Sequence, residues 1–394
     1  MDTKIIFSIV SLLFINFSLV QAQPAVFDIT KFGAAPDGKA DGSQAIADAW
    51  KEACAAAGSS KILIPAGKFL AGIVNVTGPC KGAIEVEVQG TVQAPPELAW
   101  DGWFNFNHID QFTLSRKGTL DGQGQVAWKG VSCDKDLKNC KKHPINIRFN
   151  FITKGLVRDI ASLNSKDFHV NVLGCDDFTF EGFIVSTPEG SLNTDGIHIG
   201  RSKGVTISNA KIGTGDDCIS IGDGTENLKI TKVACGPGYG INIGSLGKYE
   251  NEDHVSEITV SDCTLTGTTN GVRIKTWPAM FPNTATNIHF QDITMKNVSN
   301  PIIVDQMYCP WNKCNKKMIT EPSKVKFSDV SFKNIKGTFA TALTVQLICS
   351  SGVPCEKVEL TNIDLTYSGL EGPAKSECID IKPTIVGKIL EGCK

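Results

Sequence analysis

The segments that decide the fold are NTDGIHIG (residues 193–200), GDDCISIG (215–222) and GYGINIG (238–244). In each segment a polar residue precedes an apolar-x-apolar-Gly strand by the same offset. These polar residues, Asp195, Asp217 and Tyr239, follow one another at equal intervals in the chain. Equal intervals of this kind indicate a solenoid, in which equivalent positions lie above one another. Because neighbouring strands lie about 4.8 Å apart, we expect Asp195 and Asp217 to be spatial neighbours, with Asp216 beside them.

The strand pattern continues on both sides of these segments. Strands in the same phase occur at 170–172, 272–274, 302–304 and 343–345, and second strands between them at 205–207, 228–230, 258–260 and 288–290. The interval between strands in phase grows after Ile241, since the next one begins only at Val272, which indicates inserted loops. The pattern predicts an all-β chain that folds as a right-handed parallel β-helix, one domain over residues 23–394. A β-propeller, whose blades repeat at about 40–45 residues, is the less favoured alternative.

The start of the chain predicts two further features. Residues 1–22 are typical of a secretory signal peptide, with Lys4 before an apolar run and small residues at its end. A buried helix or a membrane anchor is the alternative, although the run is short and interrupted by polar residues. Residues 44–57 carry apolar side chains at helical spacing, and Asp41 or Ser43 is suited to cap the start. Such a helix would cover the open end of the solenoid.

Fourteen cysteines in a secreted chain indicate disulfide bonds rather than free thiols. The pairs favoured by short loops are Cys218–Cys235, Cys309–Cys314, Cys349–Cys355 and Cys378–Cys393, with Cys54–Cys80 and Cys133–Cys140 as weaker candidates. Cys175 and Cys263 remain, either as buried thiols or as a long-range bridge. Because no cysteine pair stands beside histidines at zinc-binding spacing, we expect no structural metal.

The charge balance restricts the class of partner. A formal net charge of −2 gives no reason to expect binding to nucleic acid or to an acidic membrane surface. An anionic substrate would therefore need a local basic site. Asn75 and Asn297 each begin an acceptor triplet for N-glycans. No pattern suggests a dimer interface, so we expect a monomer.

Within each strand the residue between two apolar ones faces outward, so a set of polar residues should line one face. This set comprises His198, Ser220, Asn242, Arg273 and Lys275. A lone His198 is more often a surface or packing residue, and Asp before Gly is often only a turn residue. Three carboxylates beside an Arg/Lys pair nevertheless favour a hydrolase of an anionic sugar polymer, in which the cations hold a sugar carboxylate and the acids divide the acid and base roles.

Four motifs in this register are NTD (193–195), GDD (215–217), RIK (273–275) and DQMYC (305–309). With them, the chain resembles the polygalacturonases of glycoside hydrolase family 28, and the segment at 27–38 extends the resemblance over nearly the whole chain. The sequence over residues 195–202 is similar to that of the plant, pollen-type exo-acting branch. The resemblance implies a right-handed β-helix and an enzyme that hydrolyses the α-1,4 linkages of polygalacturonate in pectin with inversion. With the signal segment, we expect it to be secreted to the cell wall, and we expect no cofactor.

The resemblance also implies roles for single residues. Asp216 would be the general acid, and Asp195 and Asp217 would activate the attacking water. The residues that would bind the galacturonate are Arg273, Lys275 and Tyr308, with His198 as a further groove residue. An inverting enzyme would separate its acid and base carboxyl groups by about 6.5–9.5 Å.

Tyr239 departs from the family motif Gly-His-Gly, and Asn242 stands where the family usually has Ser. A tyrosine stays neutral where a histidine can carry a proton. The loss of such an auxiliary catalytic group commonly lowers the rate by about 10²–10⁴. The alternative function is therefore a pectin-binding protein on the same scaffold. A pectate lyase, which would call for a calcium site and a basic proton abstractor, is less favoured.

Overall fold

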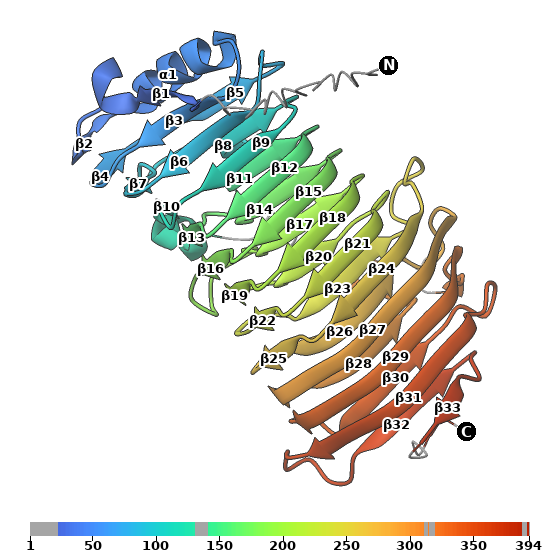
Figure 1. Cartoon of the computed structure of the whole chain (residues 1–394). Coiled ribbons are helices and arrows are strands. Elements are labelled where there is room, and N and C mark those ends of the chain that lie inside the picture. The colour runs from blue at the N-terminus through green and yellow to red at the C-terminus, as the bar shows by residue number, and fades with distance from the viewer. Residues whose placement is uncertain (1–22, 131–140, 311–313, 315–319, 388–391, 394) are drawn as a thin grey trace, which may run out of the picture.

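The computed structural model describes residues 23–130, 141–310, 314, 320–387 and 392–393, and its strands stack along one axis as a right-handed parallel β-helix (Figure 1). The predicted fold is confirmed. Each rung pairs in parallel with the rungs before and after it, and the pairing continues from the N-terminal to the C-terminal end. The predicted signal peptide and the proposed Cys133–Cys140 pair lie outside the described residues.

One face of the solenoid is an 11-stranded parallel sheet. Its strands are β5 (Val74–Thr77), β8 (Gly102–Asn107), β11 (Ile145–Asn150), β14 (Val170–Leu173), β17 (Ile197–Gly200), β20 (Ile219–Ile221), β23 (Ile241–Leu246), β26 (Asn270–Thr276), β28 (Asn300–Asp305), β30 (Leu343–Ile348) and β32 (Lys375–Ile379). The three segments that predicted the fold supply β17, β20 and β23, so this sheet carries the candidate site.

The other 22 strands form two further rows that join through one long strand. The first row is β1 (Ala25–Asp28), β3 (Ser60–Ile64), β6 (Ile84–Val88), β9 (Phe112–Ser115), β12 (Thr153–Arg158), β15 (Asp176–Glu181), β18 (Lys203–Ser208), β21 (Glu226–Thr231), β24 (Val255–Ser261), β27 (Asn283–Val298), β29 (Val325–Phe339), β31 (Glu356–Tyr367) and β33 (Thr384–Val386). The second row is β2 (Asp37–Asp41), β4 (Lys68–Leu70), β7 (Thr91–Gln93), β10 (Thr119–Asp121), β13 (Ala161–Leu163), β16 (Ile184–Ser186), β19 (Lys211–Gly213), β22 (Ala234–Cys235) and β25 (Thr264–Thr266). Both β24 and β25 pair with β27, which merges the two rows. Rungs before β27 therefore have three strands, where the sequence predicted two, and rungs from β27 onward have two.

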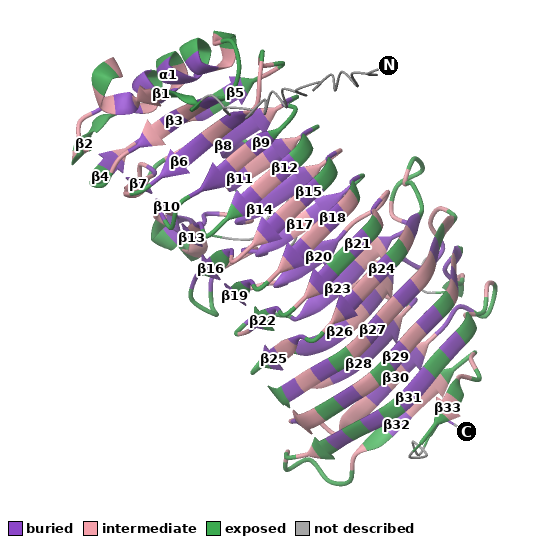
Figure 2. Cartoon of the chain, viewed as in Figure 1, coloured by how far each residue is buried: buried purple, intermediate pink, exposed green. Residues whose placement is uncertain are grey.

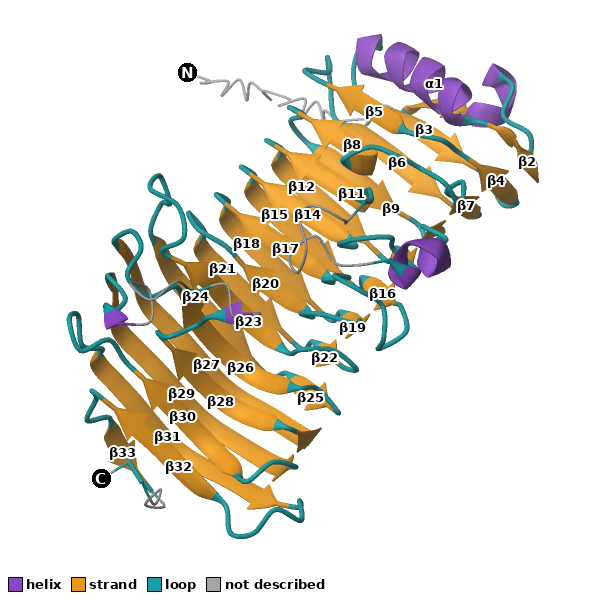
Figure 3. Ribbon diagram, turned by 180° about the vertical axis from the view of Figure 1, so that it is seen from behind, coloured by secondary structure: helices purple, strands orange, loops and turns teal. Residues whose placement is uncertain are grey.

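Helix α1 (Ser43–Ala55) covers the N-terminal end, as predicted (Figures 1 and 3). It begins one residue earlier and ends two residues earlier than expected. Gly42 occupies the N-cap position, while the Asp41 carboxylate accepts a hydrogen bond from the Ser43 N–H at 2.9 Å. Trp50, on its buried face, packs 6.1 Å from the Phe106 ring. Two 3-10 helices, η1 (Ile29–Phe32) and η2 (Gly124–Lys129), also lie among the described residues.

The core lies inside the coil and is made by the inward-facing residue pairs of each rung (Figure 2). In the candidate-site sheet Ile197 pairs with Ile219, and Ile219 with Ile241, so like residues stack on like. All three are fully buried. Burial of this kind contributes about 25 cal/mol for each Å² of apolar surface removed from water. The result is a rigid floor beneath the outward-facing side chains.

Five disulfides lie among the described residues, and each was predicted. They are Cys54–Cys80, Cys218–Cys235, Cys309–Cys314, Cys349–Cys355 and Cys378–Cys393. Cys175 and Cys263 are free and buried, so the long-range bridge between them is wrong. The Asn75 and Asn297 side chains are exposed, and their glycosylation stays a prediction. Within the described part of the chain, no helix has the length and apolar character needed to cross a membrane.

Candidate active site

A groove of about 720 Å³ runs over the outer face of β17, β20, β23 and β26. Its lining includes every sequence-predicted catalytic or binding residue: Asp195, Asp216, Asp217, Tyr239, His198, Arg273, Lys275 and Tyr308. The predicted outward row is confirmed by the strand register, in which His198 pairs with Ser220, Ser220 with Asn242 and Asn242 with Arg273.

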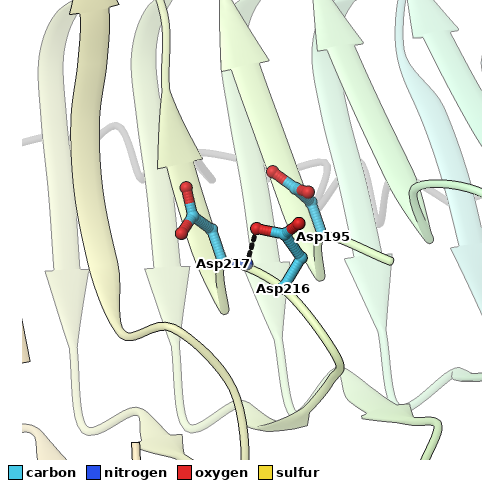
Figure 4. A group of neighbouring side chains, drawn as sticks. All are labelled: Asp195, Asp216 and Asp217. Atoms are coloured by element: carbon cyan, nitrogen blue, oxygen red, sulfur yellow. Dashed lines mark hydrogen bonds between the residues drawn. The ribbon is translucent and has the colours of Figure 1, made fainter. Parts of the chain in front are cut away.

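The three carboxylates lie together where the chain enters β17 and β20 (Figure 4). One oxygen of each of Asp195, Asp216 and Asp217 lies within 4.8 Å of the others. The backbone fixes this spacing, because the Gly196 N–H donates to the Asp217 carbonyl at 2.9 Å. The predicted proximity is confirmed. This oxygen-to-oxygen approach is shorter than the roughly 6.5–9.5 Å expected between the carboxyl groups of an inverting enzyme, so the separation gives no support for inversion.

The loops that present the carboxylates are joined to one another by local hydrogen bonds. The Thr194 hydroxyl accepts from the Gly215 N–H at 3.0 Å, which ties the NTD motif to the GDD motif. Tyr239 donates its N–H to the Asp216 carbonyl at 2.8 Å. Gly238 has φ +145°, and a Cβ there would lie 2.7 Å from the Thr214 hydroxyl. A side chain at Gly238 would therefore push the Tyr239 loop away from Asp216.

Asp217 is oriented by donors from the next two rungs. The Asn242 amide donates to one carboxylate oxygen at 2.5 Å, and the Lys275 ammonium lies 3.2 Å from the other. Asn242 is fully buried and also donates to the Tyr239 carbonyl at 2.9 Å. The sequence placed Asn242 on this face without giving it a role. The regular register of the repeats, which puts it one rung above Ser220, was the signal that could have found it.

The electrostatics of the group differ from one carboxylate to the next. Burial raises the pKa of Asp195 well above its usual value, and the nearby charges of Asp216 and Asp217 raise it further. The Lys275 ammonium opposes this rise in the Asp195 pKa. Asp216 is less buried than its two neighbours and lines the groove. Three close carboxylates that cannot all ionise easily therefore hold a proton at pH values where an isolated aspartate has lost it.

Asp195→Asn is expected to stabilise the fold at neutral pH by about 1–3 kcal/mol, the usual cost of a buried group without adequate compensation. The folded-state pKa of Asp195 lies above the unfolded value of 3.8. Folding therefore takes up a proton between these two pKa values, and stability falls as the pH rises through that window. Thermal unfolding at pH 7 and at pH 3.5 tests this, with the exposed Asp176→Asn as control. An Asp195→Asn variant with the wild-type Tm at pH 7 would contradict it.

The Arg273 and Lys275 side chains lie beside the carboxylates and against one aromatic ring. The Tyr308 ring centre is 5.0 Å from the Arg273 guanidinium and 5.4 Å from the Lys275 ammonium. Arg273 approaches Asp305 at 3.7 Å, and its buried Nε has no hydrogen-bond partner. Burial lowers the pKa of Lys275, but the charges of Asp217, Tyr308 and Asp195 together outweigh it, so the pKa is raised. Both side chains line the groove and are placed to receive an anion.

Tyr239 and His198 line the same groove. Tyr239 is 43% exposed. Burial of its hydroxyl, with the charges of Asp216, Asp217 and Glu189, raises its pKa, so the side chain is neutral. His198 shares a hydrogen bond of 2.8 Å with Ser220, and burial lowers its pKa to about 4. Neither ring carries a positive charge at neutral pH.

No sequence motif pointed to a second wall of the groove. It is formed by Ser245, Lys248, Tyr249 and Glu252, at and after the end of β23, and by Trp277, which follows β26. These residues belong to the part of the chain in which inserted loops lengthen the repeat. Loop residues carry no periodic pattern, so only the changed spacing pointed to them.

Residues 54–387 match the family described as glycosyl hydrolases family 28. The exopolygalacturonase of Oenothera organensis is 53% identical over 351 residues, which cover 88% of this chain and 96% of the relative. The exopolygalacturonase of Platanus acerifolia is 51% identical over 379 residues, which cover 95% of this chain and 99% of the relative.

A comparison with solved structures supports the architecture. The endo-xylogalacturonan hydrolase of Aspergillus tubingensis superposes with a TM-score of 0.78 at 20% sequence identity. The match covers 92% of this chain and 100% of that chain. At this identity the likeness concerns the fold alone.

Proposed function

The chain belongs to glycosyl hydrolases family 28, and from this premise we propose that it hydrolyses the α-1,4-galacturonosyl linkages of polygalacturonate. The observation that carries the proposal is the group of three carboxylates beside two charged side chains, Arg273 and Lys275, in one groove. The names of the plant relatives support this substrate and favour attack from the chain end. Plant relatives and the five disulfides also support action outside the cell.

In the proposed mechanism Asp216 is the general acid that protonates the leaving glycosidic oxygen. It is the least buried of the three aspartates, so it is the one that a substrate in the groove reaches. Asp195 and Asp217 activate the attacking water: Asp217, held by Asn242 and Lys275, takes its proton, and Asp195 orients the water. Arg273 and Lys275 bind the carboxylate of the galacturonate, while the Tyr308 ring packs beside them.

We propose inversion of configuration at the anomeric carbon. Asn242 and Lys275 each occupy one oxygen of Asp217, which favours a role in positioning water over direct attack on the sugar. Proton NMR of the first product formed checks this: inversion of an α linkage gives the β-anomer first. Release of the α-anomer first would replace the proposal with a covalent, retaining route.

The test of the proposed function is the release of reducing sugar from polygalacturonate at pH 4–7, with products resolved by length. We expect monomer alone at early times, as an exo-acting enzyme would give. Added chelator should leave the rate unchanged, because carboxylates and water carry the chemistry. Early oligomers would make the enzyme endo-acting, and loss of activity with chelator would favour a calcium-dependent lyase.

Tyr239 favours a second candidate, a pectin-binding protein with little turnover. The neutral tyrosine lies beside Asp216, where the family motif has a histidine. The remaining groove residues would still bind galacturonate. Binding without any product release, in the assay just described, would support this candidate over the hydrolase.

A further inference from the structure

The cations that line the groove differ in whether they are paired with a carboxylate of the protein. Among the described residues that line it, six carboxylates face three cations, Lys248, Arg273 and Lys275. Lys275 lies 3.2 Å from Asp217, and Arg273 lies 3.7 Å from Asp305. The charge of each of these two cations is therefore partly neutralised by a carboxylate of the protein before any substrate binds. An anionic polymer, which brings more than one carboxylate into this groove, would gain from a further cation whose charge is not already neutralised.

Lys248 is that cation. Its ammonium forms no ion pair with a carboxylate of the described residues, and instead lies 5.1 Å from the Tyr249 ring centre and 5.3 Å from the Trp277 ring centre. Contacts with aromatic faces hold an ammonium group in place without cancelling its charge. The Trp277 indole N–H donates to the Ser245 hydroxyl at 2.8 Å, which fixes one of these rings.

The loop that carries Lys248 is fixed by a carboxylate that uses its oxygens on backbone groups. Glu252 accepts from the N–H groups of Gly247, Lys248 and Tyr249 at 2.6, 2.9 and 2.9 Å. It is therefore engaged in closing the loop and does not pair with the Lys248 ammonium. The loop presents the lysine in one defined position, which lowers the entropy lost when an anion binds.

A continuous wall connects Lys248 with the pair Arg273 and Lys275. Trp277, beside Lys248, packs edge-on against Tyr308 at 5.8 Å, and Tyr308 lies against Arg273 at 5.0 Å. Two separate anion positions thus lie along one aromatic surface. A polymer that carries one carboxylate on each sugar unit matches such an arrangement.

We propose that Lys248 binds the carboxylate of a second galacturonate unit, next to the unit held by Arg273 and Lys275. This rests on the proposed function, since it deepens the account of the same groove. Lys248 is thereby a specificity residue: it favours free carboxylates over methyl esters at that unit and takes no part in bond cleavage.

Binding of galacturonate oligomers to the Asp216→Asn protein tests the proposal apart from turnover. Adding Lys248→Gln to that protein is expected to weaken trigalacturonate binding by about 10-fold, the effect of losing one charged hydrogen bond. Binding of the monomer should not change, because Arg273 and Lys275 suffice for one unit. Lys248→Arg should retain most of the affinity. Lys229→Gln, on the exposed face of β21, is the matched control.

Methyl-esterified trigalacturonate separates charge recognition from packing. Esterification should weaken binding to the Lys248 protein and have a smaller effect on the Lys248→Gln protein. In the active enzyme, Lys248→Gln should raise KM and leave kcat nearly unchanged. Equal losses on the free and esterified trimers, or an unchanged trimer affinity, would overturn the proposal. A protein that binds oligomers in this manner but releases no product would support the binding role of Lys248 and contradict only the proposed hydrolase activity.

Discussion

Asp216→Asn is expected to lower kcat on polygalacturonate by about 10²–10⁴. The leaving oxygen of a glycosidic bond needs a proton as the bond breaks, and an amide cannot supply one. Asn keeps the size of Asp, and its side-chain oxygen can still accept from the Asp217 N–H, which now donates to the Asp216 carboxylate at 2.9 Å. The substitution therefore removes the carboxyl proton of residue 216 and keeps the conformation of its loop. Initial rates of reducing-sugar release, at several substrate concentrations, measure the effect.

Two measurements make this result specific to Asp216. The exposed Asp176→Asn, on β15, changes the same chemical group outside the groove and should keep wild-type rates. KM for the Asp216→Asn protein should stay within a few-fold of wild type, because Arg273 and Lys275 remain. An Asp216→Asn protein with more than a tenth of the wild-type kcat would assign the acid role elsewhere, with Asp195 as the first candidate because its pKa is raised.

Tyr239→His is expected to raise kcat by about 10², the lower end of what one auxiliary catalytic group commonly supplies. The Tyr239 side chain is neutral, whereas a histidine beside Asp216 and Asp217 would be protonated under mildly acidic conditions. A positive charge there would assist proton delivery to the leaving oxygen. The gain should appear below about pH 6.5 and fade above it, as the imidazole loses its proton. A pH profile of kcat for both proteins measures it.

Tyr239→Phe is the control for this substitution. It keeps the ring and removes only the hydroxyl, so it tells whether the tyrosine hydroxyl already contributes. If Tyr239→Phe lowers kcat as much as Tyr239→His raises it, the tyrosine hydroxyl itself contributes to catalysis. A Tyr239→His protein slower than wild type at every pH would mean that the groove is adapted to tyrosine, and the expected deficit would not exist.

The spacing of the carboxylates was predictable because backbone register sets it. Asp195 and Asp217 stand at equivalent positions of successive rungs, and period-2 strands mark those rungs in the sequence. The third strand of the rungs before β27 was not predictable. A strand such as Lys211–Gly213 has one buried residue, which gives no alternation to detect. The short strands of the second row are recognised only by their pairing with neighbouring strands in the structure.

Side-chain geometry was less predictable than register. The distance expected between acid and base carboxyl groups was longer than the oxygen-to-oxygen approach found, and no sequence pattern records the side-chain rotamers that set this distance. The hydrogen bond from Asn242 to Asp217 joins two different rungs. Lys248 and Trp277 meet from two separate loops, one after β23 and the other after β26. Such contacts depend on how loops fold back over the sheet, which no local pattern records.

The hydrogen bond from the Gly196 N–H to the Asp217 carbonyl fixes the spacing between these two neighbouring rungs of the backbone. The backbone distance between Asp195 and Asp217 can change only by a whole rung, never by a fraction of one. Evolution can therefore adjust the spacing of this chemistry only in discrete steps. The loops after β23 and β26 extend from the edge of the sheet, where a change in loop length leaves the strand register intact. In such a scaffold new substrate preferences arise at the rim while the reaction itself is inherited unchanged.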